Sequence, residues 1–76
     1  MNVEKIRKHL VGGFHPFALH TADGCQYVVA HPEFIAISKY DVVVVNNKGD
    51  VDILDPLHIV SLKMLKHRNG AASGRN

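Results

Sequence analysis

The sequence predicts a small α+β protein, mainly β, in which one short N-terminal helix precedes five bent antiparallel strands that close into a barrel. Two patterns lead to this expectation. Short runs of alternating apolar and polar residues follow one another along the chain, separated by Gly, Pro, Asn or Asp. Only the N-terminal segment shows apolar side chains at helical spacing. With 76 residues, of which 46% are hydrophobic, the chain suffices for one thin core and one domain.

The N-terminal helix is expected over residues 3–11. Asn2 is a favourable N-cap, and Glu4 places a negative charge in the first turn, where the helix dipole favours it. Glycine readily adopts the left-handed conformation of a C-cap, so Gly12-Gly13 is expected to end the helix. The apolar stripe that should face the core consists of Val3, Ile6 and Leu10.

Residues 17–30 are predicted to form the first hairpin, because two alternating runs flank the strong turn signal Asp23-Gly24. If these two residues form the loop by themselves, His20 lies opposite Tyr27, and Cys25 is a diagonal neighbour on the same face. His20 and Cys25 would then offer two metal ligands or a thiol–imidazole pair, which makes a metal- or thiol-dependent enzyme a distant third hypothesis. The alternative is a half-exposed face on which aromatic and polar rings pack across the strands.

The second strand is expected to be long, interrupted near Pro32 and resumed at residues 34–38, because proline cannot donate to a β-ladder. Asp-Pro favours turn initiation, so Asp55–His58 is expected to form a tight 3₁₀ turn before the last strand. The remaining strands are predicted at residues 42–45, 50–54 and 59–65. Turns between antiparallel neighbours are expected at Asp23-Gly24, Lys39–Asp41, Asn46–Gly49 and Asp55-Pro56. In the last strand the inward side chains are expected to be Val60, Leu62 and Met64, with Ser61 and Lys63 outward.

Charge is distributed unevenly along the chain, although the formal net charge is only +2. Residues 66–76 contain Lys66, Arg68 and Arg75 without an acidic residue, and the segment offers no large apolar side chain to bury. We therefore expect a single folded domain over residues 1–65 and a disordered basic tail after it. A nearly neutral folded part does not by itself indicate a nucleic-acid-binding protein.

The expected element order resembles the Sm-like fold, in which an N-terminal helix precedes a strongly bent five-stranded barrel and a 3₁₀ link comes before the last strand. The likeness covers residues 3–65. Bacterial Sm-like RNA chaperones carry Tyr-Lys-His just before the last strand, and here His58 matches the histidine within Asp55-Pro56-Leu57-His58. The resemblance implies an RNA-binding surface, which here would consist of His58, Lys63, Lys66 and Arg68.

The chain is also similar to a group of small bacterial proteins that share four short motifs. Here the motifs are Pro16-Phe17, Asp23-Gly24, His31-Pro32-Glu33-Phe34 and Leu57-His58-Ile59. This likeness implies no activity. It is consistent with the product of a mobile gene cassette, such as an integron cassette.

Apart from His20 and Cys25, nothing in the sequence points to catalysis, and no segment points to a membrane. The six histidines show none of the paired spacings of zinc sites and Cys25 is the single cysteine, so no metal, cofactor or internal disulfide is expected. No Ser/His/Asp or paired-carboxylate arrangement can be placed, which argues against an enzyme. The longest apolar stretch, Val42–Val45, is far too short to span a bilayer, and the N-terminus does not resemble a secretory signal. With one unpaired cysteine, these features predict a cytoplasmic protein without a membrane partner.

Four consecutive valines make both faces of the strand predicted at residues 42–45 apolar. A sheet one layer deep, capped by one short helix, covers only one of those faces. Either Val43 and Val45 or Val42 and Val44 should therefore be covered by a second copy of the chain, with pairing through this strand or the last one. We expect a non-enzymatic homo-oligomeric binding or scaffold module, with an RNA-binding protein as the alternative.

Overall fold

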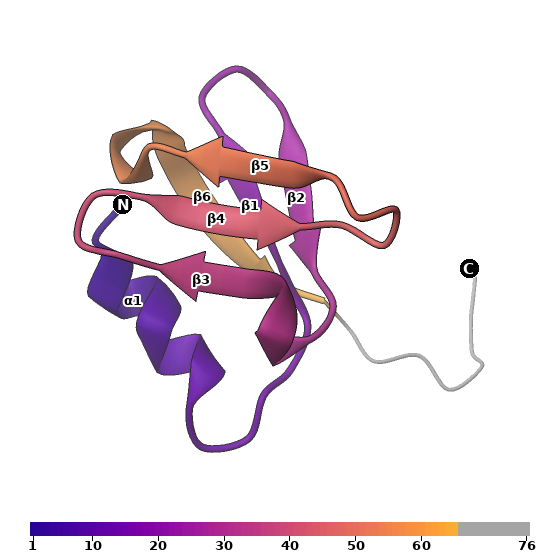
Figure 1. Cartoon of the computed structure of the whole chain (residues 1–76). Helices are drawn as coiled ribbons and strands as arrows, with labels where there is room; N and C mark the ends of the chain where they lie inside the picture. Colours follow the sequence, from indigo (N-terminus) through magenta and orange to yellow (C-terminus); the bar gives the residue numbers. More distant parts are fainter. Residues whose placement is uncertain (66–76) are drawn as a thin grey trace.

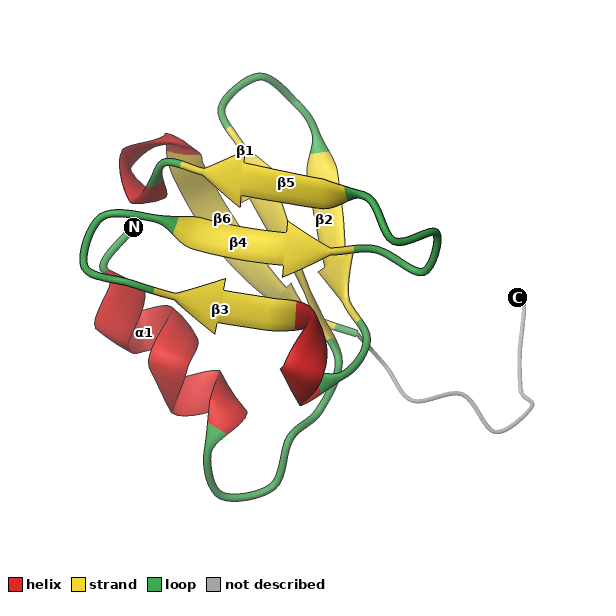
Figure 2. Ribbon diagram, viewed as in Figure 1, coloured by secondary structure: helices red, strands yellow, loops and turns green. Residues whose placement is uncertain are grey.

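The structure, a computed structural model, describes residues 1–65. One N-terminal helix precedes six β-strands (Figures 1 and 2), so the predicted α+β, mainly β class is confirmed. The helix is α1 (Val3–Arg7), and the strands are β1 (Phe17–Thr21), β2 (Gln26–Val29), β3 (Ile35–Ile37), β4 (Val42–Val45), β5 (Val51–Leu54) and β6 (Ile59–Met64). Short 3₁₀ segments lie at Lys8–Leu10, Pro32–Phe34 and Pro56–His58. The predicted basic tail, residues 66–76, lies outside the described residues.

The strands pair into two antiparallel sheets of three strands each. The first sheet has the strand order β2-β1-β6, and the second sheet has the order β3-β4-β5. In Figure 1 the strands of the second sheet cross in front of those of the first, with the core between the two layers. Five strands in a closed barrel were expected. The structure instead has six strands in two sheets, and no ladder joins the sheets within residues 1–65.

Two 3₁₀ turns carry the chain from one sheet to the other. The turn Pro32–Phe34 divides the expected long second strand into β2 and β3, because proline has no N–H for a ladder. The turn Pro56–His58 is capped by Asp55, whose carboxylate accepts a hydrogen bond from the Leu57 backbone N–H at 2.9 Å. This turn joins β5 to β6, which do not pair, so the expectation of antiparallel neighbours is wrong there. The other three predicted turns do join paired strands.

The register of the first hairpin differs by one residue from the prediction. His20 pairs with Gln26 instead of Tyr27, because the loop contains three residues, Ala22–Gly24, and closes with a hydrogen bond from the Thr21 N–H to the Cys25 carbonyl at 3.0 Å. Gly24 has a φ of 88°, the left-handed conformation that ends a three-residue hairpin loop. Since side chains alternate between faces, the one-residue shift leaves His20 on the outer face and moves Tyr27 to the inner face, opposite Leu19.

The core contains residues from α1 and from every strand. Its buried members are Ile6, Phe17, Leu19, Val29, Ile35, Val42, Val44, Leu54 and Ile59. The predicted helix stripe is confirmed, since Ile6 is fully buried and Val3 and Leu10 pack against the core. Asn2 caps the helix as predicted by accepting a hydrogen bond from the Glu4 N–H at 2.8 Å. No helix among residues 1–65 is long and apolar enough to cross a membrane.

The pattern of β6 is shifted by a β-bulge. Thr21 pairs with Ile59 and His20 with Ser61, so Val60 is an extra residue on β6. Val60 is consequently 61% exposed, so the expectation that it points inward is wrong. Leu62 and Met64 lie opposite the core residues Leu19 and Phe17 and share their face as predicted, although Met64 at the strand end is 44% exposed. A regular alternation from residue 60 to residue 64 cannot represent a strand whose phase changes at its second residue.

Candidate functional site

The residues that the Sm-like resemblance assigns to RNA binding do not form one cluster in the described part of the chain. His58 ends a 3₁₀ turn beside the first hairpin, where its carbonyl accepts from the Ala22 N–H at 2.8 Å. Lys63 pairs with Ala18 on β1. It lies five residues after His58, which is about 17 Å along an extended chain. Lys66 and Arg68 lie outside the described residues. Asp55 also lies close to His58 and adds negative charge where RNA phosphates would bind.

The four valines of β4 lie at the centre of the second sheet. β4 pairs with β3 on one side and with β5 on the other, so it has no free edge for a second copy. Of the two alternatives left open above, the structure places Val42 and Val44 in the core, and they are 0% and 2% exposed. Val43 and Val45 are half-buried and face outward.

The outward positions of the second sheet form a continuous apolar surface, which we call the apolar outer face. Its members are Ala36, Val43, Val45, Val51 and Ile53. Val43 lies between Ala36 and Ile53 in adjacent strands, and Val45 lies beside Val51. This sheet is the front layer in Figure 1, and no other described element crosses in front of β4. The contribution of Val51 and Ile53 was not predicted, although their alternation with Asp52 was visible in the sequence.

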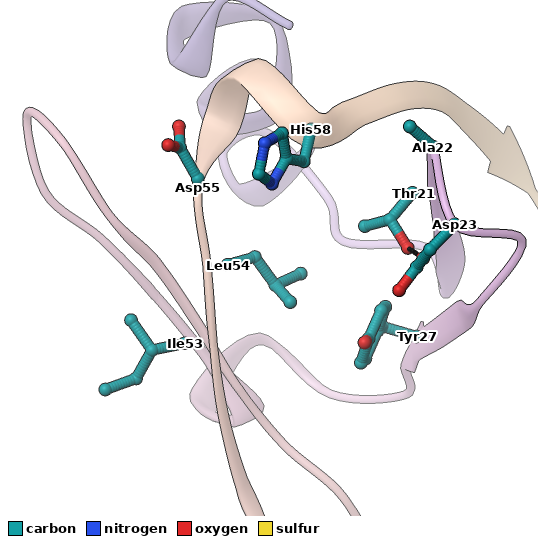
Figure 3. A pocket seen from close by; sticks show the side chains of 8 residues that line it. All are labelled: Thr21, Ala22, Asp23, Tyr27, Ile53, Leu54, Asp55 and His58. Carbon is teal, nitrogen blue, oxygen red and sulfur yellow. Dashed lines mark hydrogen bonds between the residues drawn. The ribbon is translucent and has the colours of Figure 1, made fainter.

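A pocket of about 580 Å³, which we call the corner pocket, lies where the first hairpin approaches the end of β5 and the following 3₁₀ turn (Figure 3). It is lined by Thr21, Ala22, Asp23, Tyr27, Ile53, Leu54, Asp55 and His58. In Figure 3 the side chains of Asp23, Tyr27, Leu54 and His58 converge on one space. Leu54 is part of the core and forms an apolar floor. The pocket unites segments about 30 residues apart, so sequence patterns within one element do not predict it.

Neighbouring groups shift the pKa of two side chains of the corner pocket, Asp23 and Tyr27. The Thr21 hydroxyl donates to the Asp23 carboxylate, and this bond together with the Cys25 N–H at 3.2 Å keeps the pKa of Asp23 below its usual range. Loss of hydration raises the pKa of the Tyr27 phenol, and the nearby Cys25 thiol raises it further. At neutral pH the pocket therefore contains an ionised Asp23 and a protonated Tyr27 hydroxyl. Neither Lys nor Arg is among its lining residues.

The hypothesis of a thiol or metal centre at His20 and Cys25 depended on the two side chains sharing a face. His20 faces outward, where its Nε2 lies 3.1 Å from the Gln26 Oε1. Cys25 is two residues before the inward Tyr27 and therefore shares its face, which is the face opposite to that of His20. The expectation that they are neighbours is therefore wrong. Within residues 1–65 no group of three or more His, Cys, Asp or Glu side chains is arranged to hold a metal ion.

Comparison of the chain with protein-family models, with curated proteins and with solved structures finds no match. Function is therefore inferred from the geometry of the described residues. Two features are candidates: the apolar outer face, whose chemistry fits a contact with another protein surface, and the corner pocket, whose size fits a small ligand or a side chain.

Proposed function

We propose that the protein is a non-enzymatic binding or scaffold module of Sm-like or SH3-like barrel type that works as a homo-oligomer. The observation that supports this proposal is the apolar outer face. An antiparallel sheet with one face in water normally alternates apolar inward residues with polar outward ones. In the second sheet all outward positions are apolar, and Val51 and Ile53 are 59% and 69% exposed. Covering this surface removes apolar area from water, which stabilises an association.

The contact involves a face and not an edge, because each strand that ends a sheet has a feature that opposes further pairing. On β5 the charged Asp52 points inward, opposite Val44. β6 is interrupted by the bulge at Val60, and β2 is followed by His31-Pro32. β3 contains only three residues. We therefore propose that two copies pack face to face, in place of the expected pairing through the edge of the last strand.

A second copy of the chain fits the apolar outer face better than a strongly charged partner does. The turn at one end of β4 contains Lys39 and Asp41, and the turn at the other end contains Lys48 and Asp50. In a symmetric face-to-face dimer, each turn meets a turn that carries one positive and one negative charge, whether the two β4 strands run parallel or antiparallel. The rim is therefore self-complementary, as a two-fold interface requires.

The size of the face sets the expected affinity. Three strands at about 4.8 Å spacing and four residues at about 3.4 Å each give roughly 200 Å² in plan. Stable complexes bury about 800 Å² per partner, so this face alone supports a weak dimer. Association is therefore expected in the micromolar to millimolar range of concentration.

Sedimentation equilibrium over that concentration range tests the proposal with two matched variants. Val51→Lys places a charge on the apolar outer face, and Val60→Lys places the same charge on an equally exposed valine of β6, the two sites being 59% and 61% exposed. We expect the wild type and Val60→Lys to rise above the 8.4 kDa monomer mass and Val51→Lys to remain monomeric. All three should keep the same circular dichroism spectrum. A wild type that remains monomeric throughout, or a Val60→Lys variant that also dissociates, contradicts the proposal.

A further inference from the structure

We propose that the corner pocket binds a positively charged amine or guanidinium group carried on an aliphatic stem. This site is separate from self-association, although Ile53 belongs both to its rim and to the apolar outer face. The proposal depends on three properties of the pocket: its volume, its apolar and aromatic surfaces, and the way its acceptors are held.

The volume and the apolar surfaces indicate an organic ligand instead of a bare ion. About 580 Å³ lies within the range of small-molecule sites and greatly exceeds the space that one ion needs. Leu54 forms the floor, and the Tyr27 side chain stands beside it (Figure 3). An aliphatic stem can pack on Leu54 while its cationic end lies against the Tyr27 ring, because aromatic faces attract cations.

The acceptors are held in place by hydrogen bonds from the chain before any ligand arrives. The Oδ1 of Asp23 accepts from the Thr21 hydroxyl and the Cys25 N–H, and the Oδ1 of Asp55 accepts from the Leu57 N–H. Within residues 1–65 the second oxygen of each carboxylate accepts no hydrogen bond from the chain. In Figure 3 the Asp23 carboxylate faces the pocket, whereas the Asp55 carboxylate stands at its edge, where it can meet the end of a ligand that reaches the rim. Acceptors that are already ordered lose little entropy on binding, and charged donors make the strongest hydrogen bonds to them.

The charge of the lining selects the sign of the ligand. Asp23 and Asp55 are acidic, no Lys or Arg lines the pocket, and Asp52 lies close enough to influence the nearby Tyr27 phenol. An anionic ligand such as a phosphate or a carboxylate would meet repulsion here. A neutral ligand would leave the free carboxylate oxygens without a donor.

Nuclear magnetic resonance titration of the ¹⁵N-labelled protein tests the site, with agmatine as the probe because it carries a guanidinium on a four-carbon stem. Agmatine also carries an ammonium at the other end of the stem, and N-butylurea is the neutral control that keeps the four-carbon stem and lacks both charges. Saturable shifts are expected in the amides of the hairpin loop and of residues 54–58, with roughly tenfold weaker binding of N-butylurea. Acetyl-Gly-Arg-Gly amide, added separately, distinguishes an arginine side chain of a peptide from a free amine as the natural source of the group.

Asp55→Asn is the diagnostic variant, because asparagine caps a turn as well as aspartate does and the fold should be retained. Its matched control is Asp41→Asn, which makes the same charge change in the β3–β4 turn, away from the pocket. We expect Asp55→Asn to weaken agmatine binding about fivefold or more and Asp41→Asn to change it less than about twofold. The same titration on the Val51→Lys variant should give the wild-type affinity, whether or not self-association is found.

Three results would overturn the inference. The first is the absence of saturable shifts at millimolar agmatine, and the second is equal binding of N-butylurea. The third is equal weakening by Asp41→Asn and Asp55→Asn, which would indicate attraction by the overall field of the protein. Binding of the arginine peptide alone would support the site and assign it to basic protein segments, and binding of agmatine alone would assign it to free amines.

Discussion

The two sheets of this molecule have equal numbers of strands but outer faces of different chemistry. The outward positions of the first sheet are Ala18, His20, Gln26, Val28, Ser61 and Lys63. Those of the second sheet are Ala36, Val43, Val45, Val51 and Ile53. On the first sheet a polar row of Gln26, His20 and Ser61 crosses all three strands, and the His20 ring lies 3.1 Å from the Gln26 side chain oxygen. The second sheet has no polar row.

This difference does not arise from folding, because both sheets already supply inward side chains to the same core. A polar outer face would satisfy the strand pattern of the second sheet equally well, as it does in the first. The first sheet is therefore suited to face water, whereas the second gains stability when another surface covers it. The following predictions test whether this distinction governs the behaviour of the protein.

The largest effect is expected from exchanging the inner and outer faces of one strand. Val44→Lys places a charge in the core, where Val44 is 2% exposed, and an unpaired buried charge costs about 3–5 kcal/mol, a large part of the stability of a small domain. Val43→Lys, one residue earlier, places the same charge on the apolar outer face. Circular dichroism should show loss of folded structure for Val44→Lys and retention for Val43→Lys. If both variants unfold, both faces of β4 are buried within the monomer, and the second sheet has no uncovered apolar face.

A smaller effect is expected when the second sheet is given the polarity of the first. The double variant Val43→Thr, Val45→Thr keeps β-branched shape and strand preference, so its free energy of unfolding should change by only about 1–2 kcal/mol. Its association should disappear in sedimentation velocity at concentrations where the wild type dimerises. Val28→Thr makes the same replacement on the first sheet, where Val28 is 42% exposed, and should leave association unchanged. Equal loss in both proteins would show that the two outer faces do not differ in function.

The alternative function, RNA binding, would make the outer face of the first sheet the binding surface in place of that of the second sheet. If Lys63 of the first sheet and the neighbouring basic residues bound single-stranded RNA, affinity would fall steeply with salt and would drop in Lys63→Ala. We expect no binding at low salt in fluorescence anisotropy with labelled oligouridine, because His58 and Lys63 lie at opposite ends of β6 and Asp55 lies close to His58. Salt-sensitive binding that Lys63→Ala abolishes would restore the RNA-binding hypothesis.

Local patterns in the sequence were enough to predict elements that depend on neighbouring residues. The Asn2 cap, the stripe around Ile6 and the turn positions follow from short-range chemistry, and they are confirmed. The register of a strand was not predictable from these patterns, because one extra residue in a loop or a bulge changes it. Asp23-Gly24 fits a two-residue or a three-residue loop, and the choice decides whether Tyr27 shares the face of His20 or that of Leu19. The bulge at Val60 reverses the phase of a strand in the same way.

The candidate sites were less predictable than the fold because they combine distant segments. The valines of β4 indicated an uncovered apolar face, but only the register showed that Val43 and Val45 form it together with Val51 and Ile53. The corner pocket unites the first hairpin with the turn after β5, and no pattern within either segment indicates the contact. The break at Pro32 was foreseen, but whether the chain continues in one sheet or passes into a second depends on packing between layers.

The smallest predicted effect concerns the hairpin turns, which also differ between the sheets. The β1–β2 turn of the first sheet is held by a carboxylate, since Asp23 accepts from the Thr21 hydroxyl and the Cys25 N–H. The β4–β5 turn of the second sheet is held mainly by a neutral amide, because the Asn46 Oδ1 accepts from the N–H groups of Lys48 and Asp50 at 2.9 and 3.0 Å. The Asn46 Nδ2 also donates to the Asp50 carboxylate, at the longer distance of 3.3 Å. The shortest bonds of the first turn involve a carboxylate and those of the second do not, so the first turn should respond more strongly to protonation in acid.

The Thr21 hydroxyl, and after it the Cys25 N–H, hold the pKa of Asp23 below its usual value of about 4. The carboxylate therefore contributes stability that is fully present above that usual value and is lost as the pH falls through the lower folded-state pKa. Thr21→Val removes the main donor, so its cost in urea unfolding should be largest near neutral pH and should shrink as the pH approaches 2. Asn46→Ala, which removes the amide of the other turn, should show no comparable decrease in cost. If the cost of Thr21→Val is the same at both pH values, the hydroxyl acts through packing and its bond to the Cys25 carbonyl at 3.3 Å, and the two turns do not differ in their response to acid.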